Sequence, residues 1–422
     1  MSTAAPEQPD AGELIAAADL ERARAAIAGV AVRTPTIACE ELAELSGSPV
    51  ALKAECLQRA GSFKLRGALS KLAALGETSA GLVTASAGNH GRAVADAARI
   101  REVACMVFMP RDASVSKVAA VERLGARVHL EGTTVEEALT LAAERAAETG
   151  AALVHPFDDL DVIAGQATLG LELLEDVPDL ARVLVPVGGG GLASGIGIAL
   201  RRASAKVELI GVQARVCAPF ARALRSLSST SADGAEPGAD ELSPGATIAD
   251  GIAIKQPGTL TRPLLAELLH GIETVSEDQI AAAMVFLAEH SKLVSEGAGA
   301  VATAVLLSGR LAPVEGTTVA IVSGGNVDSG LLASLLRRHE TEEGRRVRLF
   351  TRVPDRPGGL AELLGLVARA RANVVSVEHL REAVPLHVRE TGVELTLETR
   401  GPGHTAEVIA ALKAATYDVS VE

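Results

Sequence analysis

Residues 183–203 read VLVPVGGGGLASGIGIALRRA, which is an apolar run, four glycines and a second run of small and apolar residues. The first run, 183–187, predicts a buried strand, and residues 192–203 predict the helix that follows it. Glycines at such a junction let backbone N–H groups close on an anion at the start of the helix. The stretch therefore predicts a strand, a turn that can cradle a phosphate, and a helix.

The same alternation of short β-branched runs and Ala/Leu-rich stretches extends through residues 52–322. It predicts strands at 81–84, 103–109, 126–130, 207–212 and 317–322, and helices at 92–99, 114–124 and 135–148. Strands that alternate with helices in this way indicate an α/β fold with doubly wound parallel sheets.

From residue 346 onward the order of elements changes. The pattern predicts a strand at 346–353, a helix at 359–370, strands at 374–380 and 388–399, a helix at 404–415 and a strand at 417–421. This βαββαβ order is ferredoxin-like. Because the charged run RRHETEEGRR separates the two patterns, we expect one domain over 1–336, a linker over 337–345 and a second domain over 346–422.

Composition narrows the possible partners. Hydrophobic residues make up 48% of the chain and aromatic residues only 2%, so the core must be built from Ala, Val, Leu and Ile. The net charge of −13 argues against a nucleic-acid partner, which needs a basic surface. Residues 1–13 lack the apolar core of a secretion signal, and no apolar run reaches the ~18–20 residues of a membrane span. We therefore expect a cytoplasmic protein without a membrane partner.

The four cysteines do not predict a metal centre or a disulfide framework. Their spacing fits neither, and we expect reduced, buried thiols at Cys39, Cys56, Cys105 and Cys217.

A lysine in the stretch 61–68, GSFKLRGA, is the candidate nucleophile. An unperturbed lysine has a pKa near ~10.4 and is mostly protonated at neutral pH. Burial among apolar groups lowers that pKa, and the free amine can then form a Schiff base with an aldehyde. From this motif alone, an ordinary lysine on the surface of a helix over 65–75 remains the competing interpretation of Lys64.

Three more segments frame the predicted site. The turn SAGNH at 86–90 follows one strand, and SGGN at 323–326 ends another, so both offer hydroxyl and amide donors at strand ends. Positions 188, 190 and 193 also satisfy the dinucleotide pattern G-x-G-x-x-A. The next strand ends at Gln213 rather than at an acid, which favours a mononucleotide-sized phosphate. Residues 226–245, rich in Ser, Gly, Pro and acids, predict a mobile surface loop.

Together these segments resemble the fold type II pyridoxal-phosphate enzymes, which share the tryptophan synthase β-like architecture, and most closely the threonine dehydratases. The resemblance runs from about residue 33 to the C-terminus. It rests on SFKLRGA at 62–68, SAGNH at 86–90, HPFDDLDVIAGQATLGLE at 155–172, PVGGGGLASG at 186–195, TIADGIAIKQPG at 247–258, EGAGAVA at 296–302 and SGGNVD at 323–328. It implies two lobes, the smaller over about 64–152, and pyridoxal 5′-phosphate as cofactor.

The resemblance also implies roles for individual residues. Lys64 would hold the cofactor as a Schiff base, Phe63 would pack on its ring, and Asn89 would bond the ring hydroxyl. Ser323 would face the pyridine nitrogen. The cofactor phosphate would be held by Gly188, Gly189, Gly190, Gly191 and Leu192. The substrate would be bound by Ser62, Ser86, Ala87, Gly88 and His90.

The implied reaction is β-elimination of L-threonine to 2-oxobutanoate and ammonia, with Lys64 as the base for the α-proton. L-Serine would also be a substrate. An L-serine dehydratase and a serine racemase-like enzyme are the alternatives, although related racemases have a serine where this chain has Ala87. A non-catalytic amino-acid sensor is an alternative of another class. Because Gln213 stands where some relatives bind a cation through glutamate, we predict no metal.

The C-terminal module resembles an ACT domain, which implies regulation by a small effector near the loop after its first strand. The residues concerned are Asp355, Arg356, Pro357, Gly358 and Asn373. Isoleucine, valine, another amino acid or a nucleotide all remain open as effectors, and so does a purely structural dimerisation role. We expect a homodimer or a homotetramer.

Overall fold

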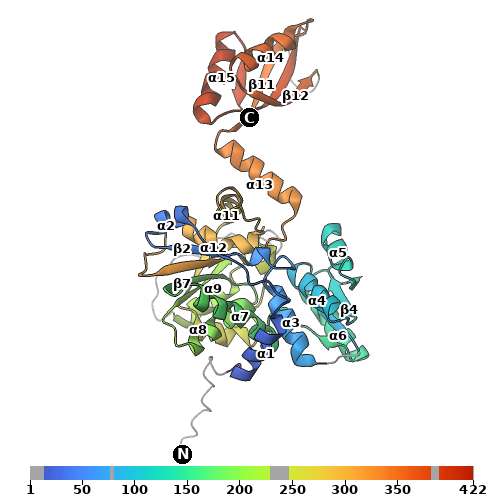
Figure 1. Ribbon diagram of the computed structural model, residues 1–422. Helices are drawn as coiled ribbons and strands as arrows, with labels where there is room; N and C mark the ends of the chain where they lie inside the picture. The colour runs from blue at the N-terminus through green and yellow to red at the C-terminus, as the bar shows by residue number, and fades with distance from the viewer. Residues whose placement is uncertain (1–13, 77–79, 229–246, 382–388, 422) are drawn as a thin grey trace, which may run out of the picture. The chain divides into compact units, whose positions relative to one another are not determined.

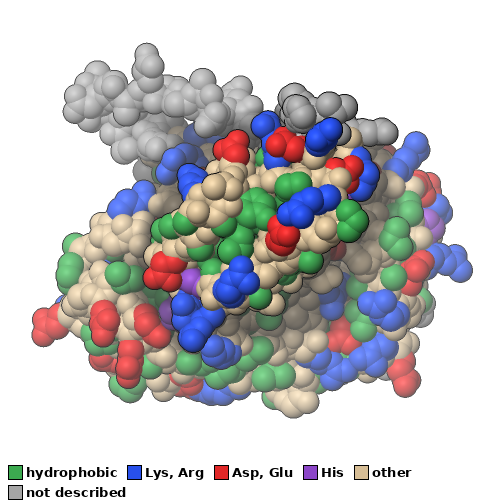
Figure 2. Space-filling view, turned by 90° about the horizontal axis from the view of Figure 1, so that it is seen from above, with side chains coloured by type: hydrophobic (Ala, Val, Ile, Leu, Met, Phe, Trp, Pro, Cys, Tyr) green, Lys and Arg blue, Asp and Glu red, His purple; other side chains and the backbone are tan. Residues whose placement is uncertain are grey.

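The computed structural model describes residues 14–76, 80–228, 247–381 and 389–421, and the chain divides into two compact units, Met1–Val327 and Asp328–Glu422 (Figure 1). Most of the loop expected at 226–245 therefore lies outside the described residues. Among the described residues, no helix is both long and apolar enough to cross a membrane. On the face seen in Figure 2, acidic and basic side chains are interspersed.

The first unit contains a large sheet of six strands. Their order across the sheet is β1 (Thr36–Ala38), β2 (Val50–Lys53), β10 (Thr317–Ile321), β7 (Leu180–Pro186), β8 (Glu208–Ala214) and β9 (Gly271–Val275). Only the edge strand β1 runs antiparallel to its neighbour; the other pairs are parallel. β7 is buried along most of its length, since Val183 and Val185 belong to the core of this sheet together with Ile321. This burial explains why strand 183–187 could be predicted as an apolar run.

A second, smaller sheet holds four parallel strands. Their order is β5 (Arg127–Leu130), β4 (Cys105–Met109), β3 (Leu82–Ala85) and β6 (Ala152–Leu153). The helices of this region are α3 (Lys64–Leu75), α4 (Asn89–Ile100), α5 (Val115–Glu122) and α6 (Val135–Thr149). Leu65 and Leu69 of α3 pack with Val94 of α4 and Val107 of β4 in one hydrophobic core. The helix that begins at Lys64 is thereby anchored in the smaller lobe.

Further helices of the first unit surround the large sheet. They are α1 (Ala17–Ile27), α2 (Glu40–Ser46), α7 (Leu160–Asp176), α8 (Gly191–Arg202), α9 (Pro219–Ser228), α10 (Thr261–Leu268), α11 (Glu277–Glu289) and α12 (Gly297–Leu307), with 3-10 turns η1 (Glu55–Leu57) and η2 (Asp250–Ile252). α3 and α7 lie side by side (Figure 1) and approach very closely. A Cβ atom on Gly165 would lie 2.4 Å from the carbonyl oxygen of Arg66, and one on Gly67 would lie 2.3 Å from Gln166 Nε2. Glycine at both positions is required for this contact between the two lobes.

The second unit contains an antiparallel sheet in the order β12 (Asn373–Leu380), β13 (Glu390–Glu398), β11 (Arg346–Pro354), β14 (Val419–Val421), with α14 (Gly359–Arg369) and α15 (Pro402–Ala414). Leu349, Leu363, Leu395 and Val408 form the centre of its core. The order β12-β13-β11-β14 is that of the ferredoxin-like fold expected from the sequence.

The charged run lies near the junction of the two units. Residues 337–342, which we expected within a linker, form the end of helix α13 (Ser329–Glu342), and the two compact units divide between Val327 and Asp328. The Asp328 side chain accepts hydrogen bonds from the N–H groups of Gly330 and Leu331, which caps the start of this helix. The charged run is the solvated end of a helix rather than an irregular connection.

Candidate active site

Lys64 is the first residue of α3, and its neighbours on the N-terminal side touch the segment after β10. The N–H of Phe63 donates to the carbonyl oxygen of Ser323 at 3.1 Å, and Ser62 forms an isolated antiparallel bridge with Gly324. Lys64 Nζ donates to the carbonyl oxygen of Pro156 at 2.7 Å and lies 5.2 Å from the centroid of the Phe63 ring. The structure therefore brings together two of the predicted segments, 62–64 and 323–324.

The environment of Lys64 makes its amine more reactive. The side chain keeps some contact with solvent, yet protein atoms enclose the ammonium closely enough that desolvation lowers its pKa from 10.5 to about 8. The negative charge of Glu296 acts in the opposite direction and does not cancel the effect. At pH 7 roughly one amine in ten is then neutral, compared with about one in 3,000 at the ordinary value. The predicted nucleophile and base is available without a strong external base.

A row of hydrogen-bonded side chains extends from Asn89, the first residue of α4. Asn89 Nδ2 donates to Glu296 Oε1 at 2.5 Å, and Asn89 Oδ1 accepts from Asn326 Nδ2 at 2.6 Å. Arg92 Nη1 in turn donates to Asn326 Oδ1 at 2.6 Å. The Asn89 amide group is held in one orientation, and its second N–H proton stays available for a ligand.

Glu296 is the site residue to which the sequence analysis gave no role. It is buried, and burial raises the pKa of its carboxyl from 4.5 to about 7; the nearby charge of Asp250 raises it further, while the hydrogen bond from Asn89 acts to lower it. A Cβ atom on Gly324 would lie 2.3 Å from Glu296 Oε1, which explains the glycine at that position. The signal was present, because Glu296 is an acid at the head of the small, apolar helix α12.

The four glycines form the turn between β7 and the start of α8. Gly190 has a φ of 97°, and no side chain caps the helix that follows it. A Cβ atom would lie 2.2 Å from the Phe157 ring at Gly189 and 2.7 Å from Thr261 at Gly190. The turn is held by Thr261 Oγ1, which donates to the carbonyl oxygen of Gly189 at 2.6 Å. The first N–H groups of α8, from Gly191 and Leu192 on, have no partner within the helix, which is the arrangement that binds a phosphate.

The segment 86–90 lies at the end of β3 and opens α4. Ser86 Oγ accepts from the N–H of Gly88 at 3.0 Å, and a Cβ atom on Gly88 would meet no atom within 4 Å. His90 is buried, with Nε2 3.0 Å from the carbonyl oxygen of Val154, so Nε2 carries the proton. Burial lowers the pKa of His90 to about 3, which keeps the ring neutral. The space beside Gly88 is therefore open, while the His90 ring faces the protein through Nε2.

The residues present fit pyridoxal phosphate. The hydroxyl of Ser62 is completely buried and has no hydrogen-bond partner, which is unusual for a protein interior unless a ligand completes the site. The Ser323 hydroxyl makes only a long contact of 3.5 Å, to the carbonyl oxygen of Ala298. A lysine amine of lowered pKa, an uncapped helix start and two hydroxyl groups with spare hydrogen-bonding capacity lie on neighbouring segments.

The comparisons with known proteins agree with this geometry. Residues 27–324 match the family model described as "Pyridoxal-phosphate dependent enzyme", and residues 347–415 match the ACT domain. The chain belongs to the family of pyridoxal-phosphate dependent enzymes. Its cofactor is therefore pyridoxal phosphate, and its second unit is an ACT domain, as the sequence predicted.

The individual relatives described here cover between 74% and 97% of the chain. An L-threonine ammonia-lyase of Thermotoga maritima is 42% identical over 411 residues, which cover 97% of this chain and 100% of the relative. A solved threonine deaminase of T.th. is 38% identical with a TM-score of 0.66, covering 74% of this chain and 98% of that one. Maize serine racemase is 31% identical with a TM-score of 0.68, covering 77% and 98%. The two-lobed fold type II architecture is thus confirmed.

The side chain of Gln213 makes two hydrogen bonds within the protein. Gln213 Nε2 donates to the carbonyl oxygen of Val187 at 3.0 Å, and Gln213 Oε1 accepts from the N–H of Ala221 at 3.0 Å. Within the described part of the chain, no group of three or more His, Cys, Asp or Glu side chains is placed to hold a metal ion.

The five predicted regulatory residues do not lie together within one ACT domain. Gly358, with a φ of 92°, starts α14, and Asp355 pairs with Arg381 at 3.0 Å beside it. Asn373 instead pairs in register with Glu398 at the opposite end of the sheet, seven residues of β12 away from Leu380 and thus roughly 23 Å from that end. Within a single chain Asn373 therefore lies away from the 355–358 loop, because β12 spans the full length of the sheet.

Proposed function

We propose that this chain is a threonine ammonia-lyase that converts L-threonine to 2-oxobutanoate and ammonia, and L-serine to pyruvate and ammonia. Water leaves from the β-carbon, and hydrolysis of the resulting imine takes up water, so the net products are the 2-oxo acid and ammonia. The observation that carries the proposal is the buried amine of Lys64, with its lowered pKa, next to the segment of Ser323. The full-length similarity to the L-threonine ammonia-lyase of Thermotoga maritima supports the choice of reaction.

We assign the roles of the side chains from their positions. Bound pyridoxal phosphate supplies an electron sink for the negative charge that develops at the α-carbon. Lys64 Nζ removes the α-proton, since its amine is neutral in a substantial fraction of molecules at pH 7. Asn89 orients the ring through its free N–H, and Ser323 offers a neutral hydroxyl to the ring nitrogen. The uncapped start of α8 holds the phosphate.

Substrate binding falls to the segments around the open space. We assign the substrate carboxylate to Ser62, whose buried hydroxyl lacks a partner, and to the turn of Ser86, Ala87 and Gly88. Ala87 carries no group that could deliver a proton to the opposite face of the α-carbon. This favours elimination over the racemisation performed by the structurally similar maize enzyme.

The test is an absorbance scan of the purified protein before and after addition of L-threonine, with 2-oxo acid production followed in the same sample. We expect a visible band from the bound cofactor, a change on addition of L-threonine, and 2-oxobutanoate. Product from L-serine alone would identify a serine dehydratase, and D-serine formation would identify a racemase. A protein without band or product after addition of pyridoxal phosphate would be a sensor.

The ACT domain supports a second part of the proposal, which is regulation of this activity by a small effector such as an amino acid. We also propose a homodimer or homotetramer and a cytoplasmic location. Initial rates measured with isoleucine, valine and other amino acids, together with the mass in solution, test these points.

A further inference from the structure

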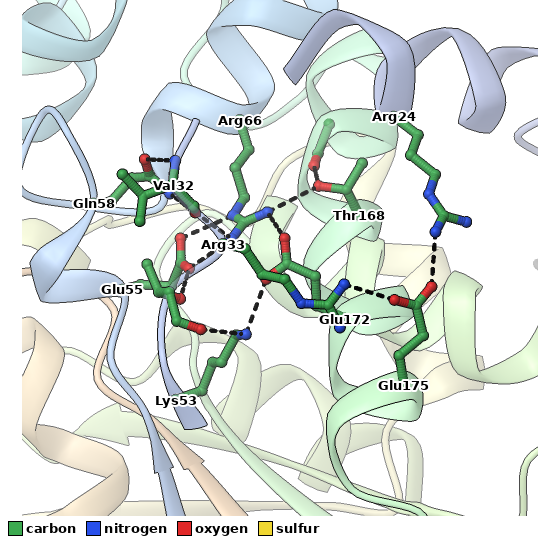
Figure 3. Close-up of polar contacts among 12 residues, drawn as sticks. Arg24, Val32, Arg33, Lys53, Glu55, Gln58, Arg66, Thr168, Glu172 and Glu175 are labelled. Atoms are coloured by element: carbon green, nitrogen blue, oxygen red, sulfur yellow. Dashed lines mark hydrogen bonds and ion pairs between the residues drawn. The ribbon is translucent and has the colours of Figure 1, made fainter. Parts of the chain in front are cut away.

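A buried arginine lies two residues after Lys64, and its guanidinium is clasped by two carboxylates. Arg66 Nε and Nη2 donate to Glu55 Oε2 and Oε1 at 2.9 and 2.8 Å, while Nη1 and Nη2 donate to Glu172 Oε1 and Oε2 at 2.6 and 3.0 Å (Figure 3). The side chains of Arg66 and Glu55 are 0% exposed. The planar guanidinium of Arg66 therefore donates to a carboxylate on each of two sides. The ammonium of a lysine, which is a point charge, does not reproduce this geometry.

The ionic contacts continue into a larger group, which we call the Arg66 cluster: Lys53, Glu55, Arg66, Glu172 and Asp176. Lys53 Nζ lies 2.9 Å from Glu172 Oε2 and 3.0 Å from Asp176 Oδ2. All five side chains are paired, but burying charges costs desolvation, and apolar side chains of similar size often give equal or greater stability. Stability alone is therefore a weak reason for such a cluster around an arginine two residues after the nucleophile.

The cluster joins three segments: the helix that carries Lys64, the turn that contacts the residue before Ser323, and the helix that follows the Pro156 loop. Arg66 is on the first turn of α3, one residue before the close contact between Gly67 and α7. Glu55 begins η1, and the next N–H, that of Cys56, donates to the carbonyl oxygen of Val322, which precedes Ser323.

Glu172 belongs to the third segment. It lies on α7, which follows the loop whose Pro156 carbonyl oxygen accepts from Lys64 Nζ. A shift of any of these segments against the others would change the distance between the amine, Ser323 and the loop.

We propose that Arg66 is a positioning residue that fixes the Lys64 amine relative to Ser323 and to the 155–158 loop, and so keeps water from the amine. The inference rests on the proposed function in so far as Lys64 is the base of the reaction. Its own consequence is physical: with the fork removed, the first turn of α3 loosens and solvent reaches the amine, whose pKa then rises towards its ordinary value.

The test uses Arg66→Lys and a matched control, Arg182→Lys. Arg182 is also a buried arginine of the first unit, with Nε 2.8 Å from Glu208 Oε2 and Nη1 2.9 Å from the carbonyl oxygen of Ala312, but it lies at the start of β7, away from the glycine turn. In the cofactor-free full-length protein, the rate of Lys64 acylation by a small reagent is followed against pH by mass spectrometry of the peptide that contains Lys64.

For the unaltered chain we expect a midpoint near pH 8. In Arg66→Lys the midpoint should rise by about one pH unit or more, and the dissociation constant of pyridoxal phosphate should rise about tenfold. Arg182→Lys should leave the pH midpoint and the dissociation constant of pyridoxal phosphate unchanged, even if its unfolding temperature falls as far as that of Arg66→Lys. Equal midpoints in the two variants would overturn the proposal.

Glu172→Gln provides a second route if Arg66→Lys does not fold, because it keeps the shape of the side chain and removes one charge of the clasp. The midpoint should move in the same direction by a smaller amount, and an unchanged midpoint with unchanged cofactor affinity would again contradict the inference. None of these measurements needs turnover of threonine. A chain that fails to deaminate threonine but shows the Arg66-dependent midpoint would refute the proposed function and keep the positioning role.

Discussion

The two units of the chain differ in where they place charge. In the first unit, Lys53, Glu55, Arg66 and Glu296 are buried, and three of them belong to one cluster of ion pairs. In the described part of the ACT domain, the ion pairs Arg356–Glu362 and Arg381–Asp355 lie on the surface, with both partners at least 40% exposed. Buried pairs fix geometry because breaking them leaves a charge without solvent, whereas exposed pairs rearrange at little cost. The buried ion pairs therefore fix side-chain positions in the first unit, whereas the exposed ion pairs of the ACT domain can rearrange when a ligand binds.

The largest expected effect is on catalysis, at the Lys64 amine of the first unit. Lys64→Ala should lower kcat for L-threonine by ~10³-fold or more, since both the covalent attachment and the base are lost. The rate of 2-oxobutanoate formation measures it. A loss of less than tenfold would show that another group removes the α-proton.

Stability should respond very differently to the loss of one partner in each unit. Glu55→Ala leaves the Arg66 guanidinium short of a carboxylate in the interior and should reduce the free energy of unfolding by about 3 kcal/mol or more. Glu362→Ala, in the exposed pair with Arg356, should change it by no more than about 0.5 kcal/mol. Denaturant midpoints of the two variants compare them directly. Similar denaturant midpoints would show that the buried pair and the exposed pair contribute equally to stability, against the difference described above.

The pH dependence of stability should reveal the buried carboxyl of Glu296. Its pKa is raised from 4.5 to about 7 in the folded chain, so the folded state binds a proton more tightly than the unfolded state. The stability that this group contributes is therefore complete below pH 4.5 and lost as the pH rises through 7. Relative to Glu296→Gln, the unaltered cofactor-free chain should lose up to about 3 kcal/mol between pH 4.5 and 8. Parallel pH profiles for the two proteins would contradict a buried, protonated Glu296.

Two glycines of the first unit, Gly324 and Gly88, should respond differently to substitution by alanine. Gly324→Ala places a methyl group 2.3 Å from Glu296 Oε1 and should weaken cofactor binding by about tenfold through displacement of Asn89. Gly88→Ala meets open space, so it should leave the unfolding temperature and cofactor affinity nearly unchanged and mainly raise KM. Cofactor titration and steady-state kinetics separate the two results. An equal loss of cofactor affinity in both would show that the space at Gly88 is not the substrate space.

The smallest effect is expected in the ACT domain. Asp355→Asn removes the charge that pairs with Arg381, beside the loop that begins α14. We expect the basal rate to stay within about twofold and the response to the effector to fall, because the change lies in the ACT domain, which we propose to be regulatory. Rates with and without the effector measure it, and an unaltered response would move the effector site elsewhere.

Local sequence patterns predicted most strands and helices, because burial of β-branched runs and helical periodicity act over a few residues. Strand β7 and helix α8 begin within three residues of their predicted positions. The contacts that shape the site were not predictable in the same way. Arg66 meets Glu172 across 106 residues, and Asn89 meets Glu296 across 207. The sequence marks such residues only as polar groups in apolar surroundings.

Helix α13 shows a second limit of prediction from the sequence. A charged run with a glycine fits a linker and a solvated helix end equally well, and the cap at Asp328 decides between them. That cap lies nine residues before the charged run begins, so composition alone could not reveal it.

The contact between Gly67 and Gly165 also restricts how this chain can vary. Neither position accepts even a methyl group without moving the helix that carries Lys64. In a library of all single substitutions selected for activity, both positions should keep glycine alone, although neither side chain could touch the substrate. Tolerance at nearby surface positions such as Arg24 would show that the constraint is the approach of two backbones. A sequence survey would then record the two glycines as a signature of spacing rather than of chemistry.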